Sequence, residues 1–316
     1  MAVIKYKKKL LWISLGADNG IASANPILTH DLEIGLHEGD TATMDVDSDT
    51  FGASEEIQTS LYSTLKFGVY VSGAKKAEPS DAPFWGELMR ASAHQEVLIP
   101  APDPDPRVEY HPVDTGFETI NLYYLRENQL HKVTAAKGGS VGFDFSKGLP
   151  KMTFEFTGVF NEPVDDPSPP AFDPTVFPRP LPFNNANTSA VIDGNTDVVL
   201  QQLTLNTGIE TKFRDLPGDE GAVTDDRNAS AGVTFMLKDD AAMRAFLAKS
   251  NSKNGVQKVA MSIQHGKTAG NIVKVAIASG QPKKPREADI DGDLGYQFDV
   301  GVIPVTGNDE YVITSQ

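Results

Sequence analysis

Apolar and polar residues alternate over many short stretches of this chain. Residues 67–71 place Phe67, Val69 and Val71 on one side, and residues 152–156 alternate in the same way. This period of two is typical of strands that bury one face and leave the other in water. The pattern therefore predicts a mainly β protein with antiparallel sheets.

Two segments, residues 82–94 and 239–250, change to a helical period. Pro83 is tolerated in a first helical turn after a possible cap at Asp81, and Asp239 can cap the second segment. We therefore predict two short helices that each turn an apolar stripe to the core. The residues expected on these stripes are Phe84, Trp85, Leu88 and Met89 in the first helix and Met243, Phe246 and Leu247 in the second.

A break divides the chain at residues 161–189, where eight prolines stand among aspartates and asparagines. Such a segment cannot be a continuous helix or a central strand. We therefore predict one domain over residues 1–160 and another over residues 190–316. The segment between them is an exposed linker or an arm that lies on a neighbouring subunit. The arm is favoured by the apolar side chains of Phe172, Val176, Phe177 and Phe183.

The order of elements before the break recurs after it. Each half reads as a strand, an acidic loop, a strand, a helix, a hairpin and a final alternating strand, although few residues are identical. Repetition of this kind predicts an internal duplication. The second copy is represented by a strand at 198–206, an acidic loop at 213–226, a strand at 232–237 and a last strand through Tyr296 and Phe298.

Net charge and composition exclude several classes of function for this chain. The net charge of -15 argues against nonspecific binding to nucleic acid, which requires a basic surface. It does not argue against DNA passing nearby, because an acidic wall repels phosphates. The chain has no cysteine, so disulfides and thiolate metal sites are excluded.

The amino terminus has some features of a secretion signal. Four lysines, at positions 5, 7, 8 and 9, precede the apolar run at residues 10–15. That run is too short for a usual signal core and far too short to cross a bilayer. We predict a basic arm leading into a first strand, and no membrane association.

Two motifs imitate ligand sites. Residues 266–268 read Gly-Lys-Thr like the end of a phosphate-binding loop, but Met261 occupies the position of the required first glycine. Residues 289–293 resemble the start of a calcium loop, but glycine stands at the fourth position and Val300 replaces the bidentate glutamate. The six histidines show no zinc-ligand spacing. We predict no catalytic residue, no metal and no cofactor.

A family resemblance begins at residues 83–91, where a proline, an aromatic-glycine pair and a Leu-Met-Arg-Ala helix follow the strand at residues 67–71. This order is similar to the tail tube (major tail) proteins of long-tailed, non-contractile (siphovirus-type) bacteriophages. Further similar segments lie at residues 27–34, 38–41, 51–54, 123–125, 131–138 and 151–158.

The resemblance implies an antiparallel β-sandwich or barrel flanked by a helix. It also implies a virion protein, assembled in the host cytoplasm, whose rings stack into a tube. The tube would enclose the tape-measure protein, meet the tail terminator and distal tail proteins, and conduct DNA without binding it specifically. If the domain is duplicated, a trimer supplies six domains, so we expect a pseudo-hexameric trimer, with a true hexamer as the alternative.

The acidic loops are the candidate site. In tail tube proteins the long loop after the first strands reaches toward the next ring, so the resemblance implies inter-ring contacts by both loops. The candidate residues are Asp40, Asp45, Asp47 and Asp49 in the first loop, and Arg214, Asp215, Asp219, Glu220, Asp225, Asp226 and Arg227 in the second.

Two other functions stay open. One is a tube-fold component such as a secretion-system tube subunit, which usually carries a single copy of the domain. The other is a carbohydrate-binding or hydrolytic β-sandwich, which requires exposed aromatic residues or a carboxylate pair on one face. The chain has only two tryptophans, Trp12 and Trp85, and one of them lies on a predicted core stripe, so the sequence gives this alternative little support.

Overall fold

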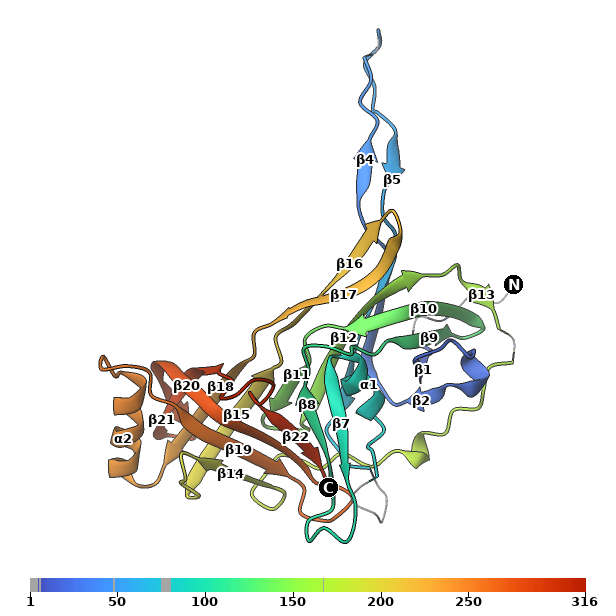
Figure 1. Ribbon diagram of the computed structural model, residues 1–316. Helices are drawn as coiled ribbons and strands as arrows, with labels where there is room; N and C mark the ends of the chain where they lie inside the picture. Colours follow the sequence, from blue (N-terminus) through green and yellow to red (C-terminus); the bar gives the residue numbers. More distant parts are fainter. Residues whose placement is uncertain (1–4, 6, 48, 75–80, 167) are drawn as a thin grey trace.

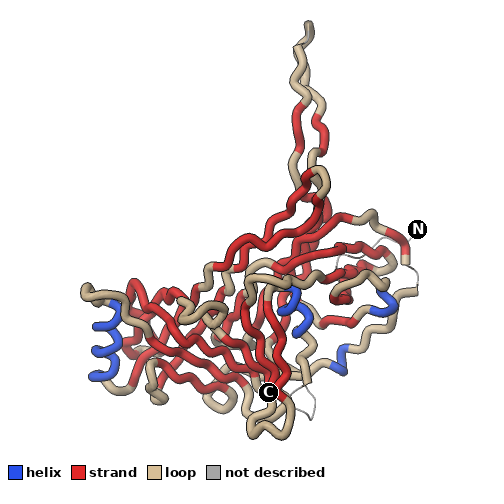
Figure 2. Tube along the Cα trace, viewed as in Figure 1, coloured by secondary structure: helices blue, strands red, loops and turns tan. Residues whose placement is uncertain are grey.

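The computed structural model is mainly β, with antiparallel pairing and two α-helices among the described residues (Figures 1 and 2). The start of the predicted first domain and Pro167 of the predicted linker lie outside the described part of the chain. The description covers residues 5, 7–47, 49–74, 81–166 and 168–316.

The first half of the chain, up to the proline-rich segment, contains most of its strands around one helix. The helix is α1 (Gly86–Ala91). The strands are β1 (Lys9–Leu15), β2 (Asn25–Ile27), β3 (His30–Glu38), β4 (Thr41–Thr43), β5 (Glu56–Gln58), β6 (Tyr62–Tyr70), β7 (His94–Ile99), β8 (Arg107–Pro112), β9 (Ile120–Arg126), β10 (Gln129–Gly138), β11 (Gly142–Phe145) and β12 (Lys151–Phe160).

The second half begins with short elements in the proline-rich segment and continues with long strands. Its α-helix is α2 (Asp240–Ser250), and a 3-10 turn, η2, covers Pro174–Val176; a similar turn, η1, covers Ile21–Ser23 in the first half. The strands are β13 (Val164–Asp165), β14 (Thr188–Ile192), β15 (Val198–Asn206), β16 (Ile209–Leu216), β17 (Asp219–Arg227), β18 (Ser230–Leu237), β19 (Val259–His265), β20 (Val273–Ile290), β21 (Asp293–Val302) and β22 (Val312–Ser315).

One central sheet runs through both halves. Its strand order is β3–β6–β12–β11–β15–β18–β21–β20, and every neighbouring pair is antiparallel. The step between the halves is the β11–β15 ladder, in which Phe143 pairs with Leu205. Three further rows of strands extend from this sheet. The first continues from β12 through β10, β9 and β1 to β2. The other two start from β20, one through β19 to β14 and one through β22 and β8 to β7.

The core lies on the covered face of these strands, as their alternating sequence predicts. Phe67 stacks on Phe154 and Phe156 at ring-centroid distances of 5.9 Å each. In the second half, Phe235 and Phe298 pack with Phe246 of α2. Strand-borne phenylalanines therefore fill both halves of one continuous hydrophobic cluster.

The first helix is shorter than predicted. It covers Gly86–Ala91 instead of residues 82–94, so Phe84 and Trp85 precede it. The chain leaves the helix through Ala93, whose positive φ of 56° is incompatible with continuing the turn, and it enters β7 at once. Trp85 is fully buried and its indole nitrogen donates to the Ser72 carbonyl at 2.8 Å.

The other helix-stripe residues lie where the pattern places them. Leu88 and Met89 are completely buried, and Phe84 packs partly buried against the core. In α2, Met243 and Phe246 are buried and Leu247 packs partly buried against the core. The prediction of α2 over 239–250 is accurate, and Asp239 caps it by accepting from the Ala241 backbone at 2.8 Å.

The proline-rich segment lies against its own chain. Phe172 meets Trp12 edge-on at a centroid distance of 5.9 Å, and Phe177 meets Phe84 at 5.3 Å. Phe183 also packs partly buried against the core. These phenylalanines, which favoured an arm on a neighbouring subunit, are therefore engaged within the chain, because the segment runs along elements of the first half before it reaches β14.

The buried His94, at the start of β7, provides a pH-dependent test of this fold. Its ring contacts the Ser92 carbonyl at 2.6 Å through Nδ1 and the Tyr311 hydroxyl at 3.0 Å through Nε2. Burial lowers the pKa of His94 to about 4, and the nearby charges of Arg227 and His111 act in the same direction. The folded protein therefore favours the neutral ring.

We expect this histidine to weaken the fold in acid. The unfolded chain takes up the proton below about pH 6.5, whereas the folded chain resists it down to about pH 4, so stability falls across that window. The loss is about 3 kcal/mol on the free energy of unfolding. Chemical denaturation of the wild type and of His94→Asn, compared from pH 7 to pH 4, measures it. Parallel stability curves for the two proteins would contradict the assignment.

Candidate assembly surfaces

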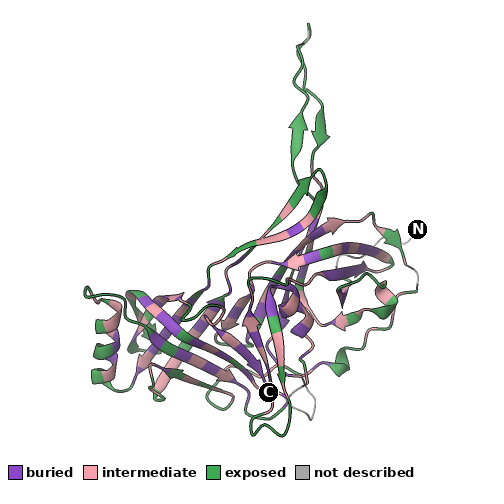
Figure 3. Ribbon diagram, viewed as in Figure 1, coloured by how far each residue is buried: buried purple, intermediate pink, exposed green. Residues whose placement is uncertain are grey.

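The first predicted acidic loop is a hairpin that projects from the molecule (Figures 1 and 3). Thr41, Ala42 and Thr43 of β4 pair with Gln58, Ile57 and Glu56 of β5, and all of these residues are exposed. At its base, Gly39 has a φ of 130°, and a Cβ there would overlap the Ser60 carbonyl. A glycine is therefore required where the chain leaves β3 for the hairpin.

The outer part of this hairpin is both apolar and acidic. Phe51 is fully exposed, and Met44, Val46 and Ile57 are also exposed. Asp45, Asp47 and Asp49 alternate with these apolar side chains along the same segment. Large apolar side chains held in water at the end of a projection mark a surface that binds another protein.

The second acidic loop is the β16–β17 hairpin, which rises at the same end of the molecule but lies over the first half (Figure 1). Phe213 stacks on Tyr62 at a centroid distance of 5.0 Å, and the Thr211 hydroxyl donates to the Gly138 carbonyl at 2.8 Å. Lys212 pairs with Asp225 across the hairpin at 2.7 Å. The candidate acidic residues of this hairpin are all exposed, namely Asp215, Asp219, Glu220, Asp225 and Asp226.

The two candidate arginines of this hairpin differ in their surroundings. Arg214 is exposed and pairs with Asp219 across the hairpin. Arg227 is 11% exposed in its side chain and donates to Glu310 through Nε at 3.1 Å and Nη2 at 2.8 Å. It also contacts Asp114 and the Val113 carbonyl. Arg227 is therefore engaged inside the chain, and we do not retain it as an inter-ring contact.

The central sheet ends in two open edges. Among the described residues, β3 is paired along one side by β6, and residues 281–290 of β20 are paired along one side by β21. Both edges thus leave a row of backbone groups for another strand. Sequence reasoning missed this surface. The available signal was the run Lys283-Lys284-Pro285-Arg286, because charged residues and proline are typical of edge strands.

The motifs that imitate ligand sites lie in turns of the described structure. Residues 266–268 connect β19 to β20 without a following helix, and residues 291–292 form the turn between β20 and β21. The described residues contain no group of three or more acidic or histidine side chains that could hold a metal ion. Within the same part of the chain, no helix has the length and apolar character needed to span a bilayer.

The tryptophans do not form a carbohydrate platform, because Trp12 and Trp85 are 1% and 0% exposed. The described surface instead offers two hairpins and two sheet edges, which suit contacts between protein subunits.

Comparison with known proteins agrees with this architecture. The family model described as phage tail tube protein matches residues 20–302, from the 3-10 turn before β2 to the end of β21. No protein of curated function gives a significant sequence match. Proteins of this family are structural subunits that assemble into the tube of the virion tail. The chain therefore belongs to the phage tail tube protein family, and it is a structural protein of a bacteriophage virion rather than an enzyme.

Proposed function

We propose that this chain builds the tail tube of a long-tailed, non-contractile phage as trimeric rings with pseudo-sixfold symmetry. The rings stack into a hollow tube that encloses the tape-measure protein and later conducts DNA. Its other partners are the tail terminator and the distal tail proteins, and assembly takes place in the host cytoplasm. The observation that carries the proposal is the intrachain joint between β11 and β15.

The trimer requires a duplicated domain, and the strand ladders support one. The ladder β3–β6–β12 has its counterpart in β15–β18–β21, and a hairpin connects the first two strands in each case. The hairpin strands β9 and β10 correspond to β19 and the first half of β20, and β1 beside β9 corresponds to β14 beside β19. α1 and α2 follow equivalent strands.

Individual positions support the same correspondence. Phe67 pairs with Phe154 as Phe235 pairs with Tyr296. One register shift of the first strand lies at equivalent places, before Glu33 in β3 and before Gln202 in β15, whereas β3 has a second shift between Gly35 and Glu38 that β15 lacks. Gly39 and Gly208 occupy equivalent hairpin bases, and at each a Cβ would overlap the carbonyl of the facing strand. Shared backbone requirements of this kind survive when residue identity does not.

In the duplicated arrangement, the pairing between β11 and β15 has a counterpart whose two strands do not pair with each other within the described part of the chain. Within the chain, β11 of the first domain pairs with β15 of the second. The counterpart of β11 is the last part of β20, and the counterpart of β15 is β3, and these are the two open edges. Pairing them between chains repeats the same joint, and three chains with six domains close the ring. Closure removes the exposed edges, which otherwise favour aggregation.

The register of the intrachain joint predicts that of the joint between chains. In the joint within the chain, Gly142 of β11 faces Asn206 of β15. Ala288 corresponds to Gly142 and His37 to Asn206, so in the joint between chains Ala288 of one chain faces His37 of the next. This register places Glu287 opposite Glu38 and Arg286 opposite Gly39. Arg286 therefore lies beside two carboxylates of like charge and offsets their repulsion across the joint.

The two acidic hairpins then make the contacts between rings. Both rise from the same end of the molecule (Figure 1), and both present exposed carboxylates and apolar side chains to a neighbour. The net charge of -15 suits a conduit that must not hold its DNA. We therefore keep Arg214 and the predicted acidic residues as candidate inter-ring contacts.

Disulfide trapping in this cysteine-free chain tests the ring. We expect His37→Cys/Ala288→Cys to form covalent dimers and trimers on oxidation of the assembled protein, because facing strand residues lie within reach of a disulfide. The matched control, Gly142→Cys/Asn206→Cys, should form an intrachain bond only. Electron cryo-microscopy should count three chains per ring. Six chains per ring, or monomers from the test pair while the control closes, would refute the trimer.

A further inference from the structure

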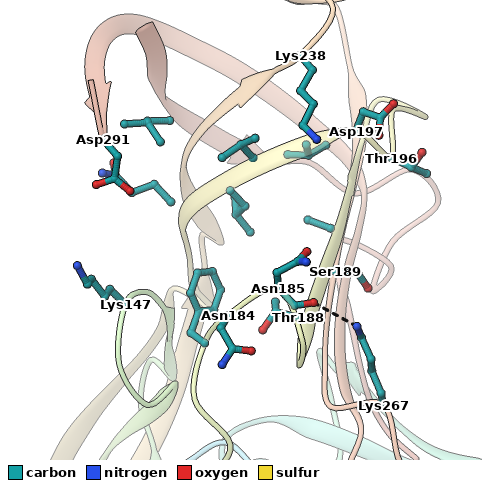
Figure 4. Close-up of a pocket in the computed structure, with 17 residues that line it drawn as sticks. Lys147, Asn184, Asn185, Thr188, Ser189, Thr196, Asp197, Lys238, Lys267 and Asp291 are labelled. Carbon is teal, nitrogen blue, oxygen red and sulfur yellow. Dashed lines mark hydrogen bonds between the residues drawn. The ribbon is translucent and has the colours of Figure 1, made fainter. Parts of the chain in front are cut away.

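A lysine-lined pocket (Figure 4) lies at the start of β15, and the β16–β17 hairpin follows the other end of this strand. Its volume is about 790 Å³, and it is bounded by the start of β15, the segment before and within β14, and the turn after β11. β15 runs from this pocket to the β16–β17 hairpin over nine residues, which is about 30 Å. The pocket and the hairpins thus occupy the two ends of the molecule that face each other when rings stack.

Three lysines surround this pocket (Figure 4). Lys267 donates to the Asn185 carbonyl at 3.2 Å. The side-chain ammonium groups of Lys147 and Lys238 make no hydrogen bond or ion pair with the described residues. Two carboxylates, Asp197 and Asp291, also line the wall, so the lining keeps a small positive excess within a strongly acidic protein. The apolar part of the lining comes from Phe183, Val198, Leu200 and Ile290.

We propose that this pocket receives the tip of the β4–β5 hairpin, residues 44–47 and 49–55, from a copy of the chain in the next ring. Phe51 enters the apolar part, and Asp45, Asp47 and Asp49 approach Lys147 and Lys238. The match is one of chemistry, because the tip combines exposed apolar residues with carboxylates and the pocket combines apolar walls with unpaired ammonium groups. The inference rests on the proposed ring stacking and adds the acceptor site.

The proposal explains why the tip is apolar. Phe51 is fully exposed in the single chain, which is unfavourable unless another molecule covers it. The carboxylates keep the tip soluble before assembly, and they form ion pairs with the pocket lysines when the rings stack. A pair of this kind also fixes which ends of two rings meet, because hairpin against hairpin places carboxylates of like sign together.

Charge reversal on both sides of the contact tests the proposal in the full chain. We expect Asp45→Lys/Asp47→Lys/Asp49→Lys and, separately, Lys147→Glu/Lys238→Glu to form rings that do not stack. The two sets combined in one chain should restore tubes. The matched control is Lys253→Glu/Lys258→Glu, which makes the same charge change on exposed residues outside the pocket and should leave stacking intact.

A separate substitution at Phe51 tests the apolar part of the proposed contact. Phe51→Ala is expected to raise the protein concentration needed for tubes about tenfold or more, since a buried phenylalanine contributes at least that factor to an association constant. In tubes, Phe51→Cys with Ser189→Cys should form a disulfide between chains of successive rings. The control pair Phe51→Cys/Val256→Cys, whose second position is also exposed but lies outside the pocket, should not.

The outcomes separate this proposal from the ring itself. Rings that stack normally in the Lys147→Glu/Lys238→Glu variant would overturn the pocket as acceptor, even if the hairpin variants fail to stack. Failure of the combined variant to restore tubes, with no disulfide at Ser189, would do the same. Absence of rings in the wild type and in the His37→Cys/Ala288→Cys protein would instead refute the proposed function.

Discussion

Replacing Trp85 by alanine is expected to destabilise the chain by about 3 to 5 kcal/mol, the range for removing a large aromatic side chain from a core. The indole is fully buried, its ring lies 5.1 Å from that of Tyr110, and its N–H donates to the Ser72 carbonyl. The substitution leaves a cavity beside α1 and an unsatisfied carbonyl at the end of β6.

Denaturant titration of the unassembled protein measures this loss. Trp85→Phe is the control, because it keeps most of the apolar volume and removes the hydrogen bond, so it should lose a smaller part of the stability. A loss below about 1 kcal/mol for Trp85→Ala would mean that neighbouring side chains close the cavity, and the segment before α1 would then not be a rigid part of the core.

Arg227→Met is expected to cost about 3 kcal/mol and to loosen the β16–β17 hairpin. The guanidinium joins the base of this hairpin to Glu310 near the carboxyl terminus and to the Val113 carbonyl of the first half. The side chain of Glu310 is 9% exposed, so the substitution leaves a buried carboxylate without its cation. Such a charge is costly because little water can reach it.

A double-mutant cycle with Glu310→Gln isolates the pair. We expect the double variant to be more stable than the sum of the single losses indicates, since removing the second charge relieves the unpaired carboxylate. Hydrogen exchange of the β16–β17 amides should increase in Arg227→Met. Additive losses together with unchanged exchange would mean that Arg227 does not hold the hairpin.

The two helices illustrate how far local sequence signals reach. α2 was predictable to within a residue, because Asp239 is a local cap and the stripe of Met243 and Phe246 has a helical period. α1 was not, because its end depends on Ala93 turning into β7, which pairs with β8 through residues 8 to 18 positions further along the chain. Local periodicity cannot weigh a strand partner against another helical turn.

The candidate site divides in the same way. The acidic residues of both hairpins were predictable, because runs of aspartate with glycine are local signals of exposed loops. The different environments of Arg214 and Arg227 were not, because Glu310 lies 83 residues from Arg227 along the chain. The open edges of β3 and β20 likewise depend on which strands pair elsewhere.

The sequence by itself determined that this protein is mainly β, that it carries two short helices and acidic loops, and that it resembles tail tube proteins. Periodicity, caps and charge are properties of neighbouring residues, so they can be read along the chain. The tertiary structure alone decided that β11 joins β15, that two matching edges stay open, and that a lysine-lined pocket lies opposite the hairpins. These features arise from backbone pairing and packing between residues far apart in sequence, where many pairings satisfy the same local pattern and the shared core selects one.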